Sequence, residues 1–243
     1  MDPHYHSSTP PRAREEITRR FADGRPAQAN YYLAEEWVGE RSFDDAGRLE
    51  EERVYRQGRP HGWQYFFHAD SEHLMSAEPY ANGLPHGTAY QWAEDCRLIG
   101  CYQMVHGTGT DLWWGSANTT SAIQLSEVHP LVAGSLHGIQ WWLGEDGEPY
   151  EETYWKMGSR HGIERCWNGD GGLRRGYPRY YIDDLRVTKR QYLRACASNP
   201  ELPPFRAQDN QPRRQLPPEI AQWLNGIPAG VIVEVRTGSG SGG

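Results

Sequence analysis

Large apolar residues and polar residues alternate in five short stretches of the chain. Each stretch follows one of five glycines, Gly62, Gly87, Gly109, Gly138 and Gly162. The first reads "GWQYFF" and the fourth "GIQWWL", with large apolar residues at the first, third and fifth positions after the glycine. Successive side chains of a β-strand point to opposite faces, so a period of two predicts a strand with one buried face. We therefore expect a strand after each glycine.

The five stretches belong to a repeated unit. The motif Tyr-x-x-Gly-x-Pro-His-Gly is written as "YRQGRPHG" and "YANGLPHG" and recurs with changes, so that the five glycines lie 25, 22, 29 and 24 residues apart. An eroded further copy reads "YYIDDLRV". Turn sequences such as Asp146-Gly147 and Asp170-Gly171 separate the copies, and Asp-Gly is favoured in hairpin turns because these need positive φ. Each copy predicts one β-hairpin, which can bury its aromatic face only by stacking on its neighbours.

The sequence thus predicts a mainly β fold: a single elongated antiparallel sheet of stacked β-hairpins over residues 30–187, with a small C-terminal helical tail. Residues 1–29 are rich in proline, serine and charge, so we expect a mobile segment with at most one short helix, in "PRAREEITRRF". The Pro-rich tail 188–236 should cap the last hairpin with a helix after Thr188, a second helix in "PEIAQWLNGIP" and an edge strand in "GVIVEVRT". Residues 237–243 are typical of an added linker and are excluded.

The glycines and histidines of the motif are expected to have structural roles. Glycine can adopt a backbone conformation closed to other residues, and the adjacent histidine would hydrogen-bond a neighbouring strand. The histidines occur once per repeat, so they would lie about 9–10 Å apart in a stacked sheet, too far for one metal ion. We therefore expect no metal and no cofactor. These repeat positions are Gly58, His61, Gly62, Gly83, His86, Gly87, Gly109, Gly134, His137, Gly138, Gly158, His161 and Gly162.

The repeated Tyr, Gly and His-Gly positions, each followed by a hairpin turn, resemble the MORN-type repeat, specifically its variant in the bacterial YwqK-type antitoxin family. The resemblance covers about residues 40–187. The sequence departs from the motif where Val105 replaces a glycine, Thr108 a histidine and Leu131 a tyrosine. The resemblance implies a non-enzymatic role in binding partners. It links MORN proteins to phospholipid membranes and to scaffolding, and the bacterial variant to toxin neutralisation.

Composition favours a cytoplasmic protein. Its four cysteines have no CxxC or zinc-binding spacing and are expected to be reduced thiols. The N-terminal sequence lacks the apolar core of a signal peptide, and no apolar run is long enough to span a membrane. Ten tryptophans and fourteen tyrosines offset the modest hydrophobic content of 37%, which suits a thin sheet with an aromatic core.

Charge is unevenly spread along the chain, whose net charge is −7. The stretch 174–214 holds ten basic residues against four acidic ones. An acidic cluster stands near the start of the repeats: Glu35, Glu36, Glu40, Asp44, Asp45, Glu50, Glu51 and Glu52. Such asymmetry is compatible with a merely solvated surface, but an acidic face would also steer a basic protein partner. It argues against nucleic acid as a ligand of the sheet and leaves phospholipid open for the basic stretch.

No sequence motif of a known catalytic site is present, so we expect a protein that is not an enzyme. Phe66, Trp113 and Trp142 occupy the fourth position after their glycines and should face away from the regular aromatic column. That column comprises Tyr65, Tyr90, Trp114, Trp141 and Trp167. Either the terminal segments cover the three opposite aromatics, or these form a patch for a partner, with sugar or base stacking as a weaker option.

Two functions follow from these observations. The first is recognition of another protein, as by an antitoxin or immunity protein, through Phe66, Trp113 and Trp142 with the acidic residues Glu50, Glu51 and Glu52. The alternative is a membrane-associated scaffold that binds anionic phospholipid through the repeats and the basic stretch 174–214.

Overall fold

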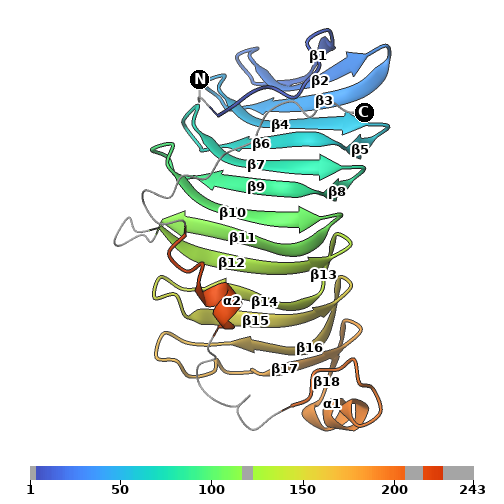
Figure 1. The fold of residues 1–243 in the computed structure, drawn as a ribbon, viewed down its shortest axis with the longest axis vertical. Helices are drawn as coiled ribbons and strands as arrows, with labels where there is room; N and C mark the ends of the chain where they lie inside the picture. The colour runs from blue at the N-terminus through green and yellow to red at the C-terminus, as the bar shows by residue number, and fades with distance from the viewer. Residues whose placement is uncertain (1–3, 117–122, 206–215, 227–243) are drawn as a thin grey trace. The chain divides into compact units, whose positions relative to one another are not determined.

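The fold is mainly β, as predicted. In the computed structural model, which describes residues 4–116, 123–205 and 216–226, eighteen strands form one open antiparallel sheet of sequential hairpins, with two short helices near the C-terminus (Figure 1). The chain divides into two compact units, of which the first ends at His106 and the second runs from Gly107 to Gly226.

The first unit contains ten strands, which form successive antiparallel hairpins along the chain. They are β1 Arg14–Arg20, β2 Pro26–Leu33, β3 Glu36–Phe43, β4 Leu49–Arg56, β5 Arg59–Pro60, β6 Gly62–Phe67, β7 Leu74–Ala81, β8 Leu84–Pro85, β9 Gly87–Trp92 and β10 Leu98–Val105. The strands β6 and β9 begin at the glycines that open the alternating stretches. The core between the hairpins contains Tyr65, Phe67, Leu74, Tyr90 and Trp92.

The second unit continues the same hairpin pattern and adds the helices. Its elements are β11 Thr108–Ser116, β12 Ile123–Val132, β13 Ser135–Leu136, β14 Gly138–Leu143, β15 Pro149–Lys156, β16 Ser159–Cys166, β17 Arg179–Ile182, β18 Leu185–Val187, α1 Lys189–Cys196 and α2 Pro218–Ala221. Thr188 caps α1 in a capping box with Gln191. Tyr192 of α1 packs with Ile163 and Tyr180, so α1 covers the last hairpin of this unit.

The sheet begins earlier than the sequence predicts. Residues 14–20 form strand β1, antiparallel to β2, instead of a mobile segment or a short helix. Ile17 is the half-buried residue of this strand and packs against the cluster around Ala29 and Tyr31, whereas its other residues are exposed and mostly charged. An edge strand presents unpaired backbone groups, and charged side chains on it discourage association with other chains. A strand at the edge of a sheet can therefore have the charged composition of a solvated segment.

The histidine of the motif links one hairpin to the next in three copies, whereas Nδ1 of His137 in the fourth copy is buried without such a donor. The turn amide of Asn82 donates to Nδ1 of His61 over 3.3 Å, and that of His106 donates to Nδ1 of His86 over 3.1 Å. Burial lowers the pKa of His61, which favours the neutral ring that can accept this bond. The second unit has the same link from Asp183 to His161, at 3.3 Å.

A threonine takes the place of the histidine in one copy. Thr108, which departs from the repeat motif, accepts a hydrogen bond from the turn amide of Ala133 at its Oγ1, over 3.1 Å. The next turn amide, that of Gly134, donates to the carbonyl oxygen of Gly107 over 2.9 Å. The link therefore needs an acceptor at this position rather than an imidazole.

Two of the motif glycines show why no other residue fits. Gly87 has a φ of +119°, and a Cβ atom there would lie 2.9 Å from Cγ of Pro79. A Cβ atom on Gly162 would lie 2.6 Å from Cβ of Tyr154 on the paired strand. The first glycine is required by backbone conformation and space together, and the second by the close approach of a neighbouring aromatic side chain.

Candidate recognition face

The regular aromatic column is buried, and we call the face that carries it the column face. In the first unit Tyr65 and Tyr90 are 0% and 5% exposed, and in the second unit the column tryptophans are no more than 7% exposed. The column tryptophans of the second unit are Trp114, Trp141 and Trp167. These side chains supply packing, so the column face is the structural face of the sheet.

Segments from the two ends of the chain cover the column face. In the first unit, Tyr5 sets its ring edge-on against Tyr65 and Phe67, with both centroid distances 5.1 Å. In the second unit, the segment that contains α2 lies beside β12, where the amide of Leu125 donates to the carbonyl oxygen of Leu224 over 2.8 Å (Figure 1). There the indole Nε1 of Trp114 donates to the carbonyl oxygen of Trp223 over 2.8 Å. The described terminal segments thus contact the face opposite to Trp113 and Trp142.

The opposite face of the second unit carries an alternating row of indoles and carboxylates. Four register pairs join directly opposed residues across β11, β12, β14, β15 and β16. The row reads Trp113, Glu127, Trp142, Glu151 and Cys166. Because strands lie about 4.8 Å apart, Glu127 lies between two indoles, and the two carboxylates lie about 10 Å apart. We call the first four of these residues, together with the adjacent Tyr150, the open face.

A hydrogen-bonded network orients the centre of the open face. Glu127 Oε2 and His129 Nε2 are 2.8 Å apart, and the His129 ring stands edge-on to the Trp142 ring with a centroid distance of 5.6 Å. Gln140 contacts Nδ1 of the same histidine over 2.7 Å, and its Oε1 accepts a hydrogen bond from Nε1 of Trp155 over 2.9 Å. These contacts hold one indole and one carboxylate side by side, both partly accessible to solvent.

The second carboxylate of the open face lies in an acidic environment. Burial, and then the negative charge of Glu164, raise the pKa of Glu151. Tyr150 is 44% exposed, and its pKa is raised by burial of the hydroxyl and by the charges of Glu151 and Glu127. The charges of Arg174 and Arg179 partly offset this rise in the pKa of Glu151, and Arg179 is paired with Glu164 at 3.3 Å. An added cation beside Glu151 would relieve the repulsion between these carboxylates.

The residues predicted to bind a partner fall into three environments. Trp113 and Trp142 are half-buried members of the open face. Phe66 is also half-buried but belongs to the first unit, where the Arg53 guanidinium lies 5.7 Å from its ring centroid and is ion-paired to Glu51. Glu50 is exposed and lies in β4, the strand that also contains Glu51 and Arg53. The aromatic side chain in the first unit is therefore already occupied by a cation from its own sheet.

The placement of Glu52 in an acidic surface patch is wrong. Its side chain is 0% exposed and faces the column side, where it pairs with Arg41 at 2.6 Å and accepts hydrogen bonds from the N-terminal segment. Glu51 and Glu52 point to opposite faces because they are successive residues of β4. Glu51 and Glu52 therefore cannot belong to one surface patch.

Sequence reasoning missed Glu127, Glu151, Tyr150 and His129. Its aromatic candidates came only from the strands that follow the glycines, and its acidic candidates only from residues 35–52, whereas these four residues lie on the returning strands β12 and β15. The alternation in "SEVHP", where Glu127 and His129 are two residues apart, is the signal that could have found them.

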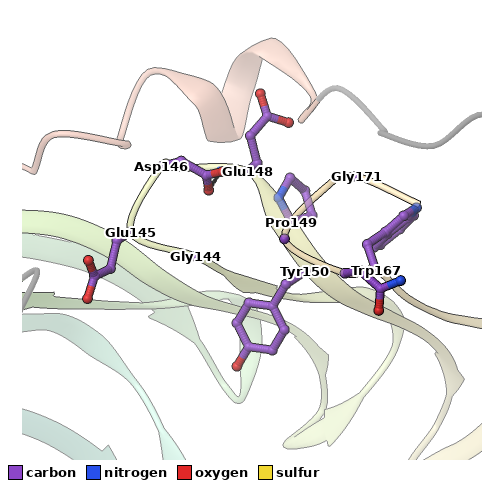
Figure 2. A pocket seen from close by; sticks show the side chains of 10 residues that line it. Gly144, Glu145, Asp146, Glu148, Pro149, Tyr150, Trp167 and Gly171 are labelled. Carbon is purple, nitrogen blue, oxygen red and sulfur yellow. Dashed lines mark hydrogen bonds between the residues drawn. The ribbon is translucent and has the colours of Figure 1, made fainter. Parts of the chain in front are cut away.

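A pocket of about 340 Å³ adjoins Tyr150 at the edge of the sheet (Figure 2). It lies between the turns 144–148 and 167–171, and three acidic residues line it: Glu145, Asp146 and Glu148. Figure 2 shows the side chains of Tyr150 and Trp167 pointing in different directions from this edge. The Asp146 carboxylate accepts a hydrogen bond from the amide of Glu148 over 3.0 Å, as is usual in such a turn.

Among the described residues, no group of three or more His, Cys, Asp or Glu side chains could hold a metal ion, and no helix is long and apolar enough to cross a membrane. No family model matches the sequence, and no curated protein matches it.

Proposed function

We propose that this protein is a non-enzymatic recognition protein that binds a basic segment of another protein on its open face and neutralises that protein in the manner of an antitoxin or immunity protein. The observation that carries this proposal is the alternation of Trp113, Glu127, Trp142 and Glu151 across four strands. The resemblance of the repeats to the YwqK-type antitoxin variant of the MORN repeat supports it.

The chemistry of the row suits arginine and lysine side chains. An indole face attracts a cation by about 0.5–2 kcal/mol, depending on how far the cation is desolvated. A carboxylate beside it forms a charge-assisted hydrogen bond, which arginine can make bidentate. Carboxylates about 10 Å apart can receive two cationic side chains of one segment. Tryptophan, tyrosine and arginine also dominate the energetics of protein interfaces.

Long-range charge favours the same kind of partner. The chain carries a net charge of −7, and such a charge accelerates encounter with a basic protein at low ionic strength. The described contacts also leave the open face free of the two segments that cover the column face. A surface of half-exposed indoles is more than solubility requires.

Binding of defined peptides tests the proposal. An arginine-rich peptide should bind the full-length protein, and a glutamate-rich peptide of the same length should not. Trp142→Ala should weaken binding by about 2 kcal/mol or more, roughly thirtyfold, while Phe66→Ala, in the first unit, is the matched control and should leave it unchanged. Equal binding of both peptides, or equal effects of both substitutions, would contradict the proposed face.

Neutralisation is tested in cells. The gene should be co-expressed with the gene beside it in its native host, and growth should be compared for the wild type and for Trp142→Ala. We expect the wild type to rescue growth and the variant to fail when expression is adjusted so that both proteins accumulate to the same level. A neighbouring product that is harmless alone, and that does not co-purify, would argue against an antitoxin.

One observation favours the alternative of a membrane-associated scaffold. Helix α1 exposes Lys189, Arg190 and Arg194 beside Leu193, which is 43% exposed. Basic residues next to an exposed leucine suit a surface of anionic lipid. Sedimentation with phosphatidylserine vesicles would support the scaffold if binding is salt-sensitive and lost in Lys189→Gln/Arg190→Gln. Absence of sedimentation at low salt would exclude it.

A further inference from the structure

The N-terminal residues 4–9 lie on the column face of the first unit as a bound peptide would. They belong to no strand or helix. Beyond them the chain continues through Pro10 and Pro11 into β1. Every contact described below joins this segment, which we call the N-terminal strap, to side chains of the sheet rather than to its backbone ladder.

One carboxylate receives most of the polar contacts of the strap. Both the Tyr5 hydroxyl and the Ser7 hydroxyl donate to Oε2 of Glu52 over 2.9 Å, and the Ser7 hydroxyl also lies 3.2 Å from Oε1. The backbone amides of Ser8 and Thr9 donate to Oε1 over 2.6 Å and 3.3 Å. Two successive amides that converge on one oxygen are an arrangement that proteins use to bind anions.

Sheet residues complete the site around Glu52. Arg41 pairs with the Glu52 carboxylate at 2.6 Å and donates to the Ser7 hydroxyl over 2.7 Å. Tyr65 and Phe67 receive the Tyr5 ring, as described above. His4 stacks on Trp92 with a centroid distance of 5.5 Å and an interplanar angle of 21°. We call Arg41 and Glu52, together with Tyr65, Phe67 and Trp92, the column-face site.

The site demands a specific kind of ligand. A buried carboxylate is costly unless donors satisfy it, and Arg41 alone leaves acceptor positions for further donors. The strap fills these positions with an aromatic hydroxyl, an aliphatic hydroxyl and two consecutive N–H groups. The aromatic residues beside the carboxylate add shape selectivity for a tyrosine ring.

We propose that the column-face site is a peptide-binding site, filled in this structure by the chain's own strap. Its ligand is a segment of a partner protein with the same chemistry: a tyrosine followed, two to four residues later, by hydroxyl residues with free backbone amides. The strap competes from within the chain at a high effective concentration, so a partner segment binds by displacing it. This site is separate from the open face and does not depend on the function proposed for that face.

A peptide with the strap sequence, HYHSSTPP, labelled with a fluorophore, is the probe. Fluorescence anisotropy is measured with the full-length wild type, with the strap-weakened variant Tyr5→Ala/Ser7→Ala, and with His6→Ala, which changes an exposed strap residue. The strap-weakened variant should bind about tenfold or more tightly than the wild type, because its internal competitor is weaker. His6→Ala should behave as the wild type, and adding Glu52→Gln to the weakened variant should abolish binding.

A second peptide, AYASST, keeps the tyrosine and hydroxyl residues and replaces the histidines by alanine. It should bind the weakened variant within a few-fold of the first peptide. If neither peptide binds this variant while its circular dichroism matches that of the wild type, the proposal is wrong. A concentration-dependent dimer that disappears with Glu52→Gln would also overturn it, because the site would then belong to the strap of a second copy.

Hydrogen exchange on the unaltered protein gives an answer even if the variants do not fold. The amides of Ser8 and Thr9 should be protected in the free protein, since they bond to a buried carboxylate. Excess unlabelled HYHSSTPP should speed their exchange at least several-fold while leaving the amides of β6 unchanged. Unchanged exchange at Ser8 and Thr9 under saturating peptide would refute displacement.

Discussion

Two adjacent tryptophans in β14 should differ in what their truncation costs, the first mainly stability and the second mainly partner binding. Trp141 faces the column side and is 7% exposed, whereas Trp142 is half-buried on the open face. Truncating the two side chains in turn compares the two faces at nearly the same point of the same strand. The strand, the chemical change and the volume removed are the same in both variants.

The magnitude follows from the area that each indole buries. A tryptophan that is almost fully buried removes about 200 Å² from water, worth about 5 kcal/mol at roughly 25 cal/mol per Å². The alanine side chain keeps part of this burial free energy, whereas the cavity left by the indole adds a further cost. Trp141→Ala should therefore lower the free energy of unfolding by about 3–5 kcal/mol. Trp142 buries a smaller part of its surface, and its loss should cost about half as much.

Urea unfolding followed by far-UV circular dichroism measures both changes without relying on indole fluorescence. Trp141→Ala should lower the transition midpoint strongly and leave peptide affinity in the folded fraction intact. Trp142→Ala should lower the midpoint less and weaken binding of the arginine-rich peptide. A Trp142→Ala protein that is as unstable as Trp141→Ala, and still binds the peptide, would refute the assignment of the two faces.

Four further predictions concern the repeat, the helix and pH. Gly162→Ala should destabilise the protein by about 1–3 kcal/mol in urea unfolding, because its Cβ would clash with Tyr154, whereas Gly169→Ala, where no heavy atom lies within 4 Å, should be tolerated. Thr108→Val should cost about 1 kcal/mol by leaving the Ala133 amide without its acceptor, and Thr110→Val on the same strand is the control. Thr188→Ala should cost about 1 kcal/mol and increase hydrogen exchange in the first turn of α1, with Ser198→Ala as the control. Because the pKa of His61 is lowered in the folded protein, the unfolded chain takes up a proton first as pH falls below about 6.5. The contribution of His61 to stability is therefore present above that pH and is lost as pH falls below it. His61→Gln should remove this part of the pH dependence of the free energy of unfolding.

The sheet could be predicted from the sequence because period and turn chemistry agree in most copies of the repeat. Glycines at the strand starts and the cap at Thr188 are local signals, and local signals of this kind are what sequence carries best. The edge strand β1 was not predicted because its composition is that of a solvated segment. The segment "GVIVEVRT" lies outside the described residues.

The open face could not be predicted in full because it depends on register. Trp113 and Trp142 were predicted from their own strands, but Glu127 and Glu151 lie beside them only through the pairing of β12 and β15 with their neighbours. Register shifts at Trp113/Trp114 and at Trp142/Leu143 change which residues are opposed. The exposure of Glu52 was mispredicted for a related reason, because its hydrogen-bond donors lie in a segment more than forty residues away in the chain.

The links between turns also bear on how such a protein can change length in evolution. Each link joins the acceptor of one hairpin, at His61, His86, Thr108 or His161, to an amide in the following turn. Duplication or loss of one whole hairpin preserves the spacing between each of these acceptors and the turn that follows it, and it keeps the two faces of the sheet in phase. Gain or loss of a single strand would break a link and reverse the chain direction of all later strands. Variation in steps of one complete hairpin is therefore the change that this architecture tolerates best.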